Sequence, residues 1–137
     1  MKERAGLALD DGHHIMLLQG TVQMFPALVR AMDAAEHRIQ FETYIFDLTG
    51  GGILVAEALL RAAQRGVHTS LLVDGYGTGA LPQEWRTRFK AAGLKLRVYS
   101  PLGRLGLLLP QRWRRMHRKL CVVDARVLFC GGINVLD

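Results

Sequence analysis

The chain has 137 residues, of which 50% are hydrophobic and 22% are charged, which suits one domain built around one core. This mixture excludes a disordered tail and a polytopic membrane protein, and no stretch has the roughly 20 apolar residues that a spanning helix needs. The formal net charge of +6 is regional, because residues 85–123 hold 11 basic residues and no acid, which favours an anionic partner such as a phospholipid surface, nucleic acid or phosphorylated substrate.

The first third of the chain alternates strand and helix patterns. Residues 14–18 form an apolar run that predicts a short strand, and Thr21 is placed to cap a helix after it. The apolar side chains of that helix recur at i, i+3 and i+4 spacing, namely Met24, Phe25, Leu28, Val29 and Met32. Residues 38–46 alternate and then become aromatic and β-branched, which predicts a second strand.

The middle of the chain continues the alternation. Three glycines after Thr49 open a helix that Gly66 ends. Its expected core stripe is Ile53, Leu54, Ala56, Leu59, Leu60 and Ala63. A strand at 67–73 leads into a glycine-rich loop at 74–79, where a P-loop lysine is missing and nucleotide binding is not expected. A helix over 82–92 and a strand over 94–99 follow.

The last third predicts an irregular segment and a hairpin. Prolines and glycines block regular structure over 101–115, whereas 119–123 and 126–129 are two short strands that turn at Asp124 and Ala125. Strand–helix alternation at this spacing predicts an α/β sandwich with a mixed, mostly parallel sheet and an antiparallel final hairpin.

The two cysteines, Cys121 and Cys130, form no disulfide framework and no metal cluster. Both lie in apolar runs typical of buried strands, where cysteine packs as a small hydrophobe. We therefore expect free thiols and a reducing compartment.

The segment that carries chemistry begins at His117. On a strand, His117 and Lys119 project from the same face, and burial would disfavour the charge of both. An anion between them explains the pair, with Lys119 as a point charge and His117 as nucleophile or proton donor. The glycines before Asn134, Gly132 among them, let a phosphate approach the backbone, and the Asn134 amide can donate to it. An isolated His-x-Lys pair is more often an exposed strand end, but the full spacing favours a site.

This spacing resembles the phospholipase D superfamily signature, His-x-Lys-x4-Asp-x6-Gly-(Gly/Ser)-x-Asn. The positions that fill it are His117, Lys119, Asp124, Gly131, Gly132 and Asn134. Four further segments look like the bacterial cardiolipin synthase branch, at 41–46, 62–67, 72–77 and 116–120. The resemblance runs from about His14 to the end of the chain, and it implies a phospholipase D-like α/β/α sandwich lobe.

The resemblance also implies roles for individual residues. His117 would attack the lipid phosphorus to form a phosphohistidine, or protonate the leaving alcohol, while Lys119 and Asn134 hold the non-bridging oxygens. Asp124 would be mainly structural. The basic groups stand in for a metal ion, so no metal and no cofactor are expected.

Two further regions are candidates for lipid contact. Glu42 and Tyr44 share one face of the strand that leads to the site, and either contact the headgroup or Lys119 or simply cap the strand at the surface. Residues 102–115 combine leucines, an interfacial Trp and arginines, a composition that suits docking on anionic lipid, with a core-packing loop as the alternative.

The family's active site combines two such motifs, one per lobe, with an acid downstream of the asparagine. We therefore expect residues 1–137 to be a single lobe, the truncated N-terminal half of a two-lobe enzyme, inactive by itself; pairing with a second copy is the alternative. The expected activity is phosphatidyl transfer to the glycerol hydroxyl of phosphatidylglycerol at the cytoplasmic face of a bacterial membrane. A phosphodiesterase or nuclease that works as a homodimer, and a lipid-binding module without turnover, remain open.

Overall fold

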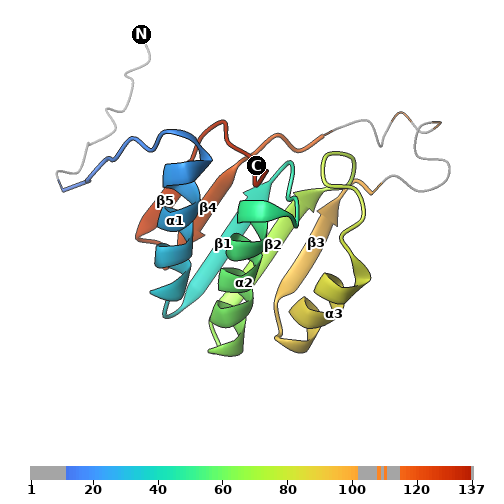
Figure 1. The fold of residues 1–137 in the computed structure, drawn as a ribbon, viewed down its shortest axis with the longest axis horizontal. Helices are drawn as coiled ribbons and strands as arrows, with labels where there is room; N and C mark the ends of the chain where they lie inside the picture. Colours follow the sequence, from blue (N-terminus) through green and yellow to red (C-terminus); the bar gives the residue numbers. More distant parts are fainter. Residues whose placement is uncertain (1–11, 102–107, 109, 111–114, 137) are drawn as a thin grey trace, which may run out of the picture.

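The computed structural model describes residues 12–101, 108, 110 and 115–136, which contain three helices and a five-stranded sheet (Figure 1). In chain order these elements are α1 (Gly20–Asp33), β1 (Arg38–Thr43), α2 (Gly50–Gln64), β2 (His68–Asp74), α3 (Gln83–Ala91), β3 (Lys95–Tyr99), β4 (Leu120–Val123) and β5 (Val127–Cys130). None of the described helices combines the length and apolar character that a membrane crossing requires.

The sheet is mixed, in the order β3-β2-β1-β4-β5. β1 pairs in parallel with β2, and β2 with β3, whereas β4 is antiparallel to both β1 and β5. The hairpin turns where the sequence predicts it, at Asp124 and Ala125, whose φ angles are +52° and +53°. The Arg126 N–H donates to the Val123 oxygen at 3.0 Å across these two residues, and β5 begins one residue later than expected, at Val127. The predicted α/β fold with a mixed sheet and a final antiparallel hairpin is confirmed, whereas the described residues supply helices to one face of the sheet and not the second helical layer of an α/β/α sandwich.

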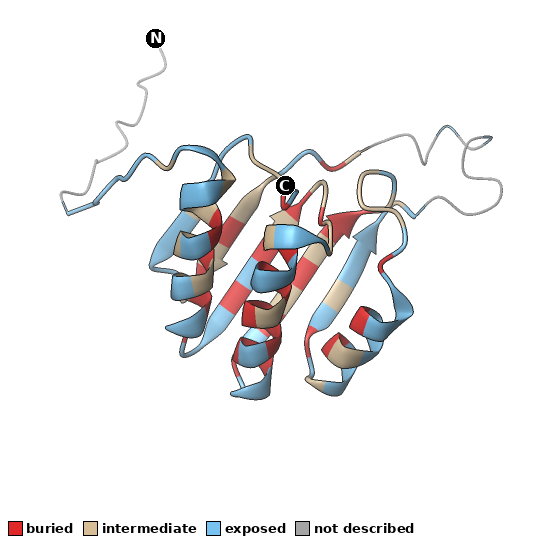
Figure 2. Ribbon diagram, viewed as in Figure 1, coloured by how far each residue is buried: buried red, intermediate tan, exposed pale blue. Residues whose placement is uncertain are grey.

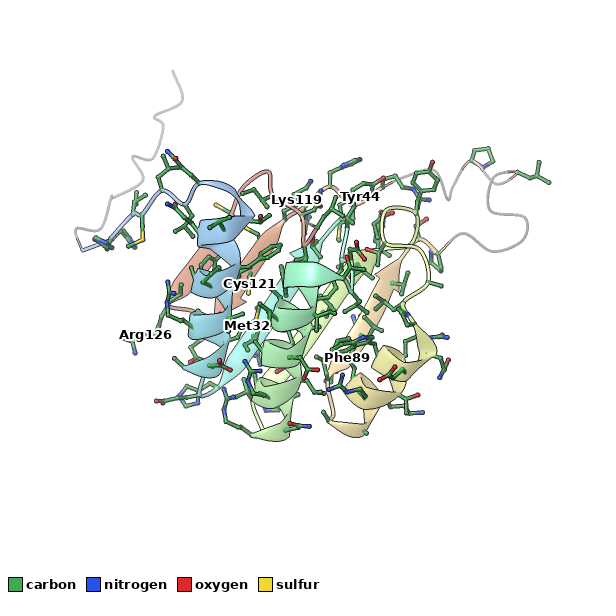
Figure 3. All side chains as sticks on the ribbon, in the orientation of Figure 1. Met32, Tyr44, Phe89, Lys119, Cys121 and Arg126 are labelled. Carbon is green, nitrogen blue, oxygen red and sulfur yellow. The ribbon has the colours of Figure 1, made fainter. Side chains whose placement is uncertain are left out.

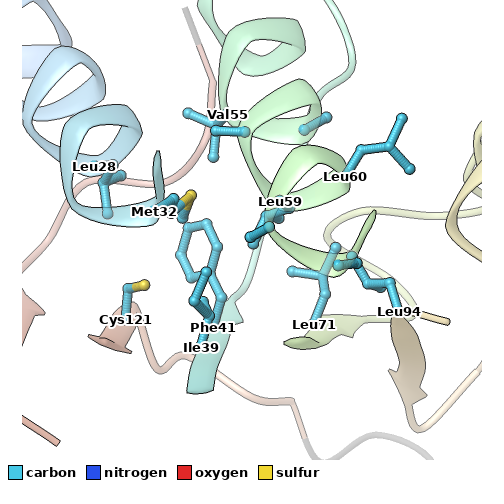
Figure 4. Close-up of a cluster of buried hydrophobic side chains, with 14 of the residues drawn as sticks. Leu28, Met32, Ile39, Phe41, Val55, Leu59, Leu60, Leu71, Leu94 and Cys121 are labelled. Atoms are coloured by element: carbon cyan, nitrogen blue, oxygen red, sulfur yellow. The ribbon is translucent and has the colours of Figure 1, made fainter. Parts of the chain in front are cut away.

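The core lies between the sheet and the three helices, which cover the same face of the sheet (Figures 1 and 2). Alternation along the strands sends every second side chain toward the helices, so Ile39 and Phe41 of β1 meet Met32 of α1 and Leu59 of α2 (Figure 4). The predicted apolar face of α1 is confirmed: Phe25, Leu28 and Met32 are buried, and Met24 and Val29 pack against the core.

Three details differ from the sequence-based expectation at the start of the chain. Residues 14–18 form no strand, because they pair with no other strand of the described chain; Ile15 is 90% exposed. Helix α1 begins at Gly20 with Gln19 as its cap residue, so Thr21 lies inside the helix. Strand β1 ends at Thr43, because the chain then diverges to pair Phe46 with Val135.

The buried face of α2 and the burial of one cysteine also differ from the sequence-based expectation. The buried face of α2 is centred on its small residues, with Ala56 and Leu59 fully buried, and this places Leu54 about half a turn away, where it is 60% exposed. Ile53 is exposed for the same reason. Cys121 is buried as expected, whereas Cys130 is exposed, because it lies on the edge strand β5.

Replacing Phe89 by alanine should cost about 3–5 kcal/mol of unfolding free energy. Phe89 is completely buried, and its ring lies 5.5 Å from that of Trp85, so truncation leaves a cavity beneath the short helix α3. Urea denaturation of the chain measures this effect. Val22→Ala, on the exposed side of α1, is the control and should change the free energy by no more than about 0.5 kcal/mol. Equal losses for the two variants would contradict the assigned core.

Candidate active site

The topology brings distant segments to one edge of the sheet. Parallel strands β1 and β2 end at this edge, and because β4 runs antiparallel to β1, the residues that precede β4 lie there too. The chain that leaves β5 returns to the same edge, where Val135 bridges Phe46. Tyr44, from the end of β1, and Lys119, from the start of β4, lie close together there (Figure 3).

His117, Tyr44 and Lys119 form the centre of the site. The imidazole of His117 stacks on the ring of Tyr44, with centroids 4.5 Å apart and planes 27° from parallel. The Lys119 Nζ donates to the backbone oxygen of His117 at 3.2 Å and lies 5.8 Å from the Tyr44 ring centroid. An aromatic face attracts cations, so the Tyr44 ring draws the Lys119 ammonium toward it. Tyr44 therefore stacks on the His117 ring and lies near the Lys119 side chain.

Asn134 is anchored beside this centre. Its Oδ1 accepts the backbone N–H of Ile45 at 3.1 Å, which orients the amide beside the end of β1. The neighbouring backbone is tied down as well: Val135 donates to Ile45 and accepts from Asp47. Gly132 is exposed, and a Cβ there would meet nothing within 4 Å, so the structure leaves room for a ligand against this backbone.

Glu42 and Tyr44 have different surroundings. β1 ends between them, so they do not act as a pair on one strand face. The Glu42 carboxylate forms an ion pair with Arg118 at 3.5 Å. Glu42 also lines a groove of about 560 Å³ that is formed by β1, β2, β3 and the ends of the helices before β2 and β3. His117, Lys119 and Asn134 do not line that groove. The structure therefore brings Tyr44, rather than Glu42, to the predicted site.

Asp124 lies at the opposite edge of the sheet, after β4. Its carboxylate accepts the backbone N–H groups of three consecutive residues that lead into β1, Glu36, His37 and Arg38, at 2.8–2.9 Å. Hydrogen bonds from Arg38, Glu36 and His37 lower the pKa of Asp124 from 3.8 to about 2. The structure thus separates Asp124 from His117, and its contacts fit the mainly structural role that the resemblance implies.

The lowered pKa of Asp124 predicts an acid-dependent loss of stability. Since the folded pKa lies below the unfolded one, the ionised carboxylate stabilises the fold above about pH 4, and this contribution disappears as the pH falls toward 2. Asp124→Asn should lower the urea midpoint at pH 7. The difference between variant and wild type should shrink as the pH approaches 2. A difference that is the same at pH 7 and pH 2 would contradict this role.

The sequence reasoning missed Asp74, a carboxylate with no exposed surface at the end of β2. Its oxygens accept the N–H groups of Tyr76 (2.8 Å), Gly77 (3.1 Å) and Met116 (2.9 Å), and Arg115 donates to it at 3.2 Å. Burial opposes ionisation, but these donors prevail and the pKa of Asp74 is lowered. The usable signal was an Asp before Gly-x-Gly at a strand end, which predicts an Asx turn.

The predictions of a lipid-contact loop and of a site without metal are not tested by the structure. Most of the expected lipid-contact loop at 102–115 lies outside the described residues; within it, Leu108 is exposed. In the described part of the chain, no three His, Cys, Asp or Glu side chains are grouped as metal ligands.

The sequence of the chain is similar to that of a known family and of several known proteins. Residues 28–137 match the family described as "Cardiolipin synthase, PLD-like domain". The chain is 43% identical over 124 residues to cardiolipin synthase B of Escherichia coli (strain K12), covering 90% of this chain and 30% of that protein. It is 32% identical over 137 residues to cardiolipin synthase A of Erwinia tasmaniensis, covering 99% of this chain and 28% of that protein.

A solved structure shares the fold. The phospholipase D family member Nuc from Salmonella typhimurium superposes with a TM-score of 0.57 at 21% identity, over 81% of this chain and 64% of that one. At this identity the likeness concerns the fold alone. The chain spans less than a third of the length of the cardiolipin synthases that it matches.

Proposed function

Because the chain belongs to the phospholipase D-like domain family of cardiolipin synthases, we propose that it is one catalytic lobe of an enzyme that transfers phosphatidyl groups between phospholipids. The observation that carries this proposal is the stacking of His117 on Tyr44, with Lys119 beside them, at the sheet edge where Asn134 is also anchored. A nucleophile next to a fixed cation and an oriented amide is the arrangement that phosphoryl-type transfer needs.

The chemistry proceeds in two displacements. A ring nitrogen of His117 attacks phosphorus, the bond from phosphorus to the leaving glycerol oxygen breaks, and an acid delivers a proton to that oxygen. The hydroxyl of the acceptor lipid then attacks the phosphohistidine, gives its proton to the same group, and frees His117. Lys119 and the Asn134 amide hold the non-bridging oxygens, where negative charge accumulates.

The proton that the leaving oxygen takes up must come from an acid other than His117. His117 cannot be both nucleophile and proton donor in one step, so the proposal includes a second lobe that supplies the other histidine. The length of the related synthases leaves space for such a lobe in the same polypeptide, and a second copy of this chain is the alternative source. We expect residues 1–137 to be inactive by themselves.

The substrate is proposed to be phosphatidylglycerol, serving as phosphatidyl donor and as acceptor, at the cytoplasmic face of a bacterial membrane. The basic segment 85–123 contains Lys119 and matches an anionic lipid surface in charge. The same basicity suits nucleic acid, whose binding would weaken steeply with salt. A homodimeric phosphodiesterase acting on DNA is therefore the competing function to be tested beside it.

The test uses the complete protein that contains this chain, with vesicles of labelled phosphatidylglycerol. Conversion to cardiolipin with release of one glycerol per product is the expected result. A short DNA duplex and single strand are offered to the same preparation as the second arm. Cleavage of DNA without lipid conversion would replace the proposal with the phosphodiesterase, and lipid binding without either reaction would leave a binding module.

A further inference from the structure

We propose that the tight turn formed by residues 74–78, here called the 74–78 turn, positions the imidazole of His117, with Asp74 as the central positioning residue. The catalytic consequence rests on the proposed function, whereas the geometry stands without it. The turn contacts two parts of the structure that adjoin His117. The first is the backbone of Met116, directly before His117, and the second is Tyr44, on whose ring His117 stacks. These are called the backbone route and the aromatic route below.

The backbone route begins at the buried carboxylate. Asp74 Oδ2 accepts the N–H of Met116, the residue directly before His117, at 2.9 Å. Asp74 Oδ1 accepts two N–H groups of its own turn, so the carboxylate ties the approach to β4 to the end of β2. Met116 is itself buried, and the hydrogen bond is shielded from water. The position of the His117 backbone is thereby set from a segment more than 40 residues away.

Arg115 completes this first route. Its guanidinium donates to Asp74 Oδ1 at 3.2 Å, to the backbone oxygen of Ser100 at 3.2 Å and to the Ser100 hydroxyl at 3.3 Å. Its side chain is largely covered, so the ion pair is not a solvated surface contact. Residues 115 and 116 are both held by Asp74, so the backbone that leads directly into His117 is fixed.

The aromatic route runs through Thr78 and Gly77. The Thr78 hydroxyl donates to the Tyr44 backbone oxygen at 2.9 Å and accepts the Phe46 N–H at 3.1 Å, so it clamps the chain on both sides of Ile45. Gly77 packs directly against Tyr44: a Cβ there would lie 2.6 Å from the Tyr44 oxygen and 2.8 Å from its ring. The turn therefore supports the ring that His117 stacks on.

The two routes together explain how an exposed histidine keeps one orientation. His117 is solvent-accessible, and an exposed side chain would otherwise sample several rotamers. Holding the backbone on one side and the stacking partner on the other removes that freedom. A misplacement of about 1 Å at a reacting group costs about 10²-fold in rate, so a support of this kind has a measurable effect.

Proton NMR of the imidazole signals of the 137-residue chain tests the geometry. All five histidines are exposed, and in the described part of the chain the one that stacks on an aromatic ring is His117. Its ring protons should be shifted by the Tyr44 ring current away from the other four sets, with the assignment made from His117→Gln. Asp74→Asn and, independently, Thr78→Val should move these signals toward the positions of exposed histidines.

Glu57→Gln is the matched control. It also converts an arginine-paired carboxylate into an amide, but the Glu57–Arg88 pair lies on α2 and α3, away from the site. It should leave the His117 signals where they are. If the folded Asp74→Asn and Thr78→Val variants both keep the wild-type His117 signals, the proposal is overturned. Thr78→Val keeps the side-chain shape, so the test survives a failure of Asp74→Asn to fold.

Turnover in the complete protein tests the consequence. Asp74→Asn should lower kcat by about 10²-fold with little change in KM, whereas Glu57→Gln should leave both unchanged. Rates are compared per folded molecule of the complete protein. An unchanged kcat in an active enzyme would overturn the positioning role in catalysis. A wild type with no lipid turnover would instead overturn the proposed function, and the NMR result would still decide the geometry.

Discussion

Replacing His117 by glutamine in the complete protein should lower phosphatidyl transfer by about 10⁴-fold or more. The side chain is proposed to form the covalent bond to phosphorus, and loss of a nucleophile that acts as part of a catalytic unit removes most of the rate enhancement. Glutamine retains the size and polarity of the side chain. Because the His117 side chain is exposed and its ring stacks on the surface of Tyr44, the substitution should leave the fold intact. The measurement is the initial rate of cardiolipin formation from labelled phosphatidylglycerol.

Two controls sharpen this result. His68→Gln changes another exposed histidine, at the start of β2, and should leave the rate unchanged. Label that stays on the wild-type protein after the reaction is quenched, and that acid then releases, would identify the phosphohistidine. The His117→Gln protein should carry no such label. A His117→Gln enzyme that retains more than about a tenth of the wild-type rate would contradict the assigned nucleophile.

Replacing Lys119 by methionine should lower kcat by about 10²–10³-fold. The ammonium lies at the site edge, held by the backbone oxygen of His117 and close to the Tyr44 ring. It is proposed to meet the charge that develops on the non-bridging oxygens, and removal of one such group from a preorganised site costs about 2.7–4 kcal/mol. Methionine keeps the length of the side chain and removes its charge. Steady-state kinetics on vesicles give kcat and KM separately.

The neighbouring Arg118 is the matched control for this substitution. Arg118→Met removes the same charge one residue away, but the Arg118 side chain is 72% exposed and pairs with Glu42 on the other side of the strand. An exposed ion pair contributes about 0–1 kcal/mol, so the rate should change by at most about fivefold. Equal effects for the two substitutions would mean that the basic segment acts through its overall charge, for example by membrane attraction, and that Lys119 has no specific role.

Much of the fold follows from local patterns in the sequence. The spacing of Phe25, Leu28 and Met32 predicts which face of α1 is buried, and the two-residue step at Asp124 and Ala125 predicts the hairpin. The same reasoning fails for residues 14–18, because an apolar run becomes a strand only where another strand can accept its hydrogen bonds. It also fails for Leu54, where small residues on the opposite side of α2 decide which face is buried.

In the candidate site, too, some features follow from local sequence and others from tertiary structure. The spacing of His117, Lys119 and Asn134 is a local property, and it predicts a site whose three side chains come from segments that meet at one edge of the sheet. The chemical role of each side chain stays a prediction. Tertiary structure alone decided that Tyr44 stacks on His117 and that Asp124 lies at the far edge of the sheet.

The buried Asp74 shows most clearly why local sequence patterns do not predict contacts between elements. The residues that it holds at 115 and 116 follow it by 41 and 42 positions, and only the order of strands in the sheet brings them together. Periodicity and motif spacing describe which residues share a face of one element, because they depend on the repeat of that element. Contacts between elements depend on the direction and order of strands, so the sequence by itself determined which side chains are candidates for the chemistry, and the tertiary structure decided what holds them in place.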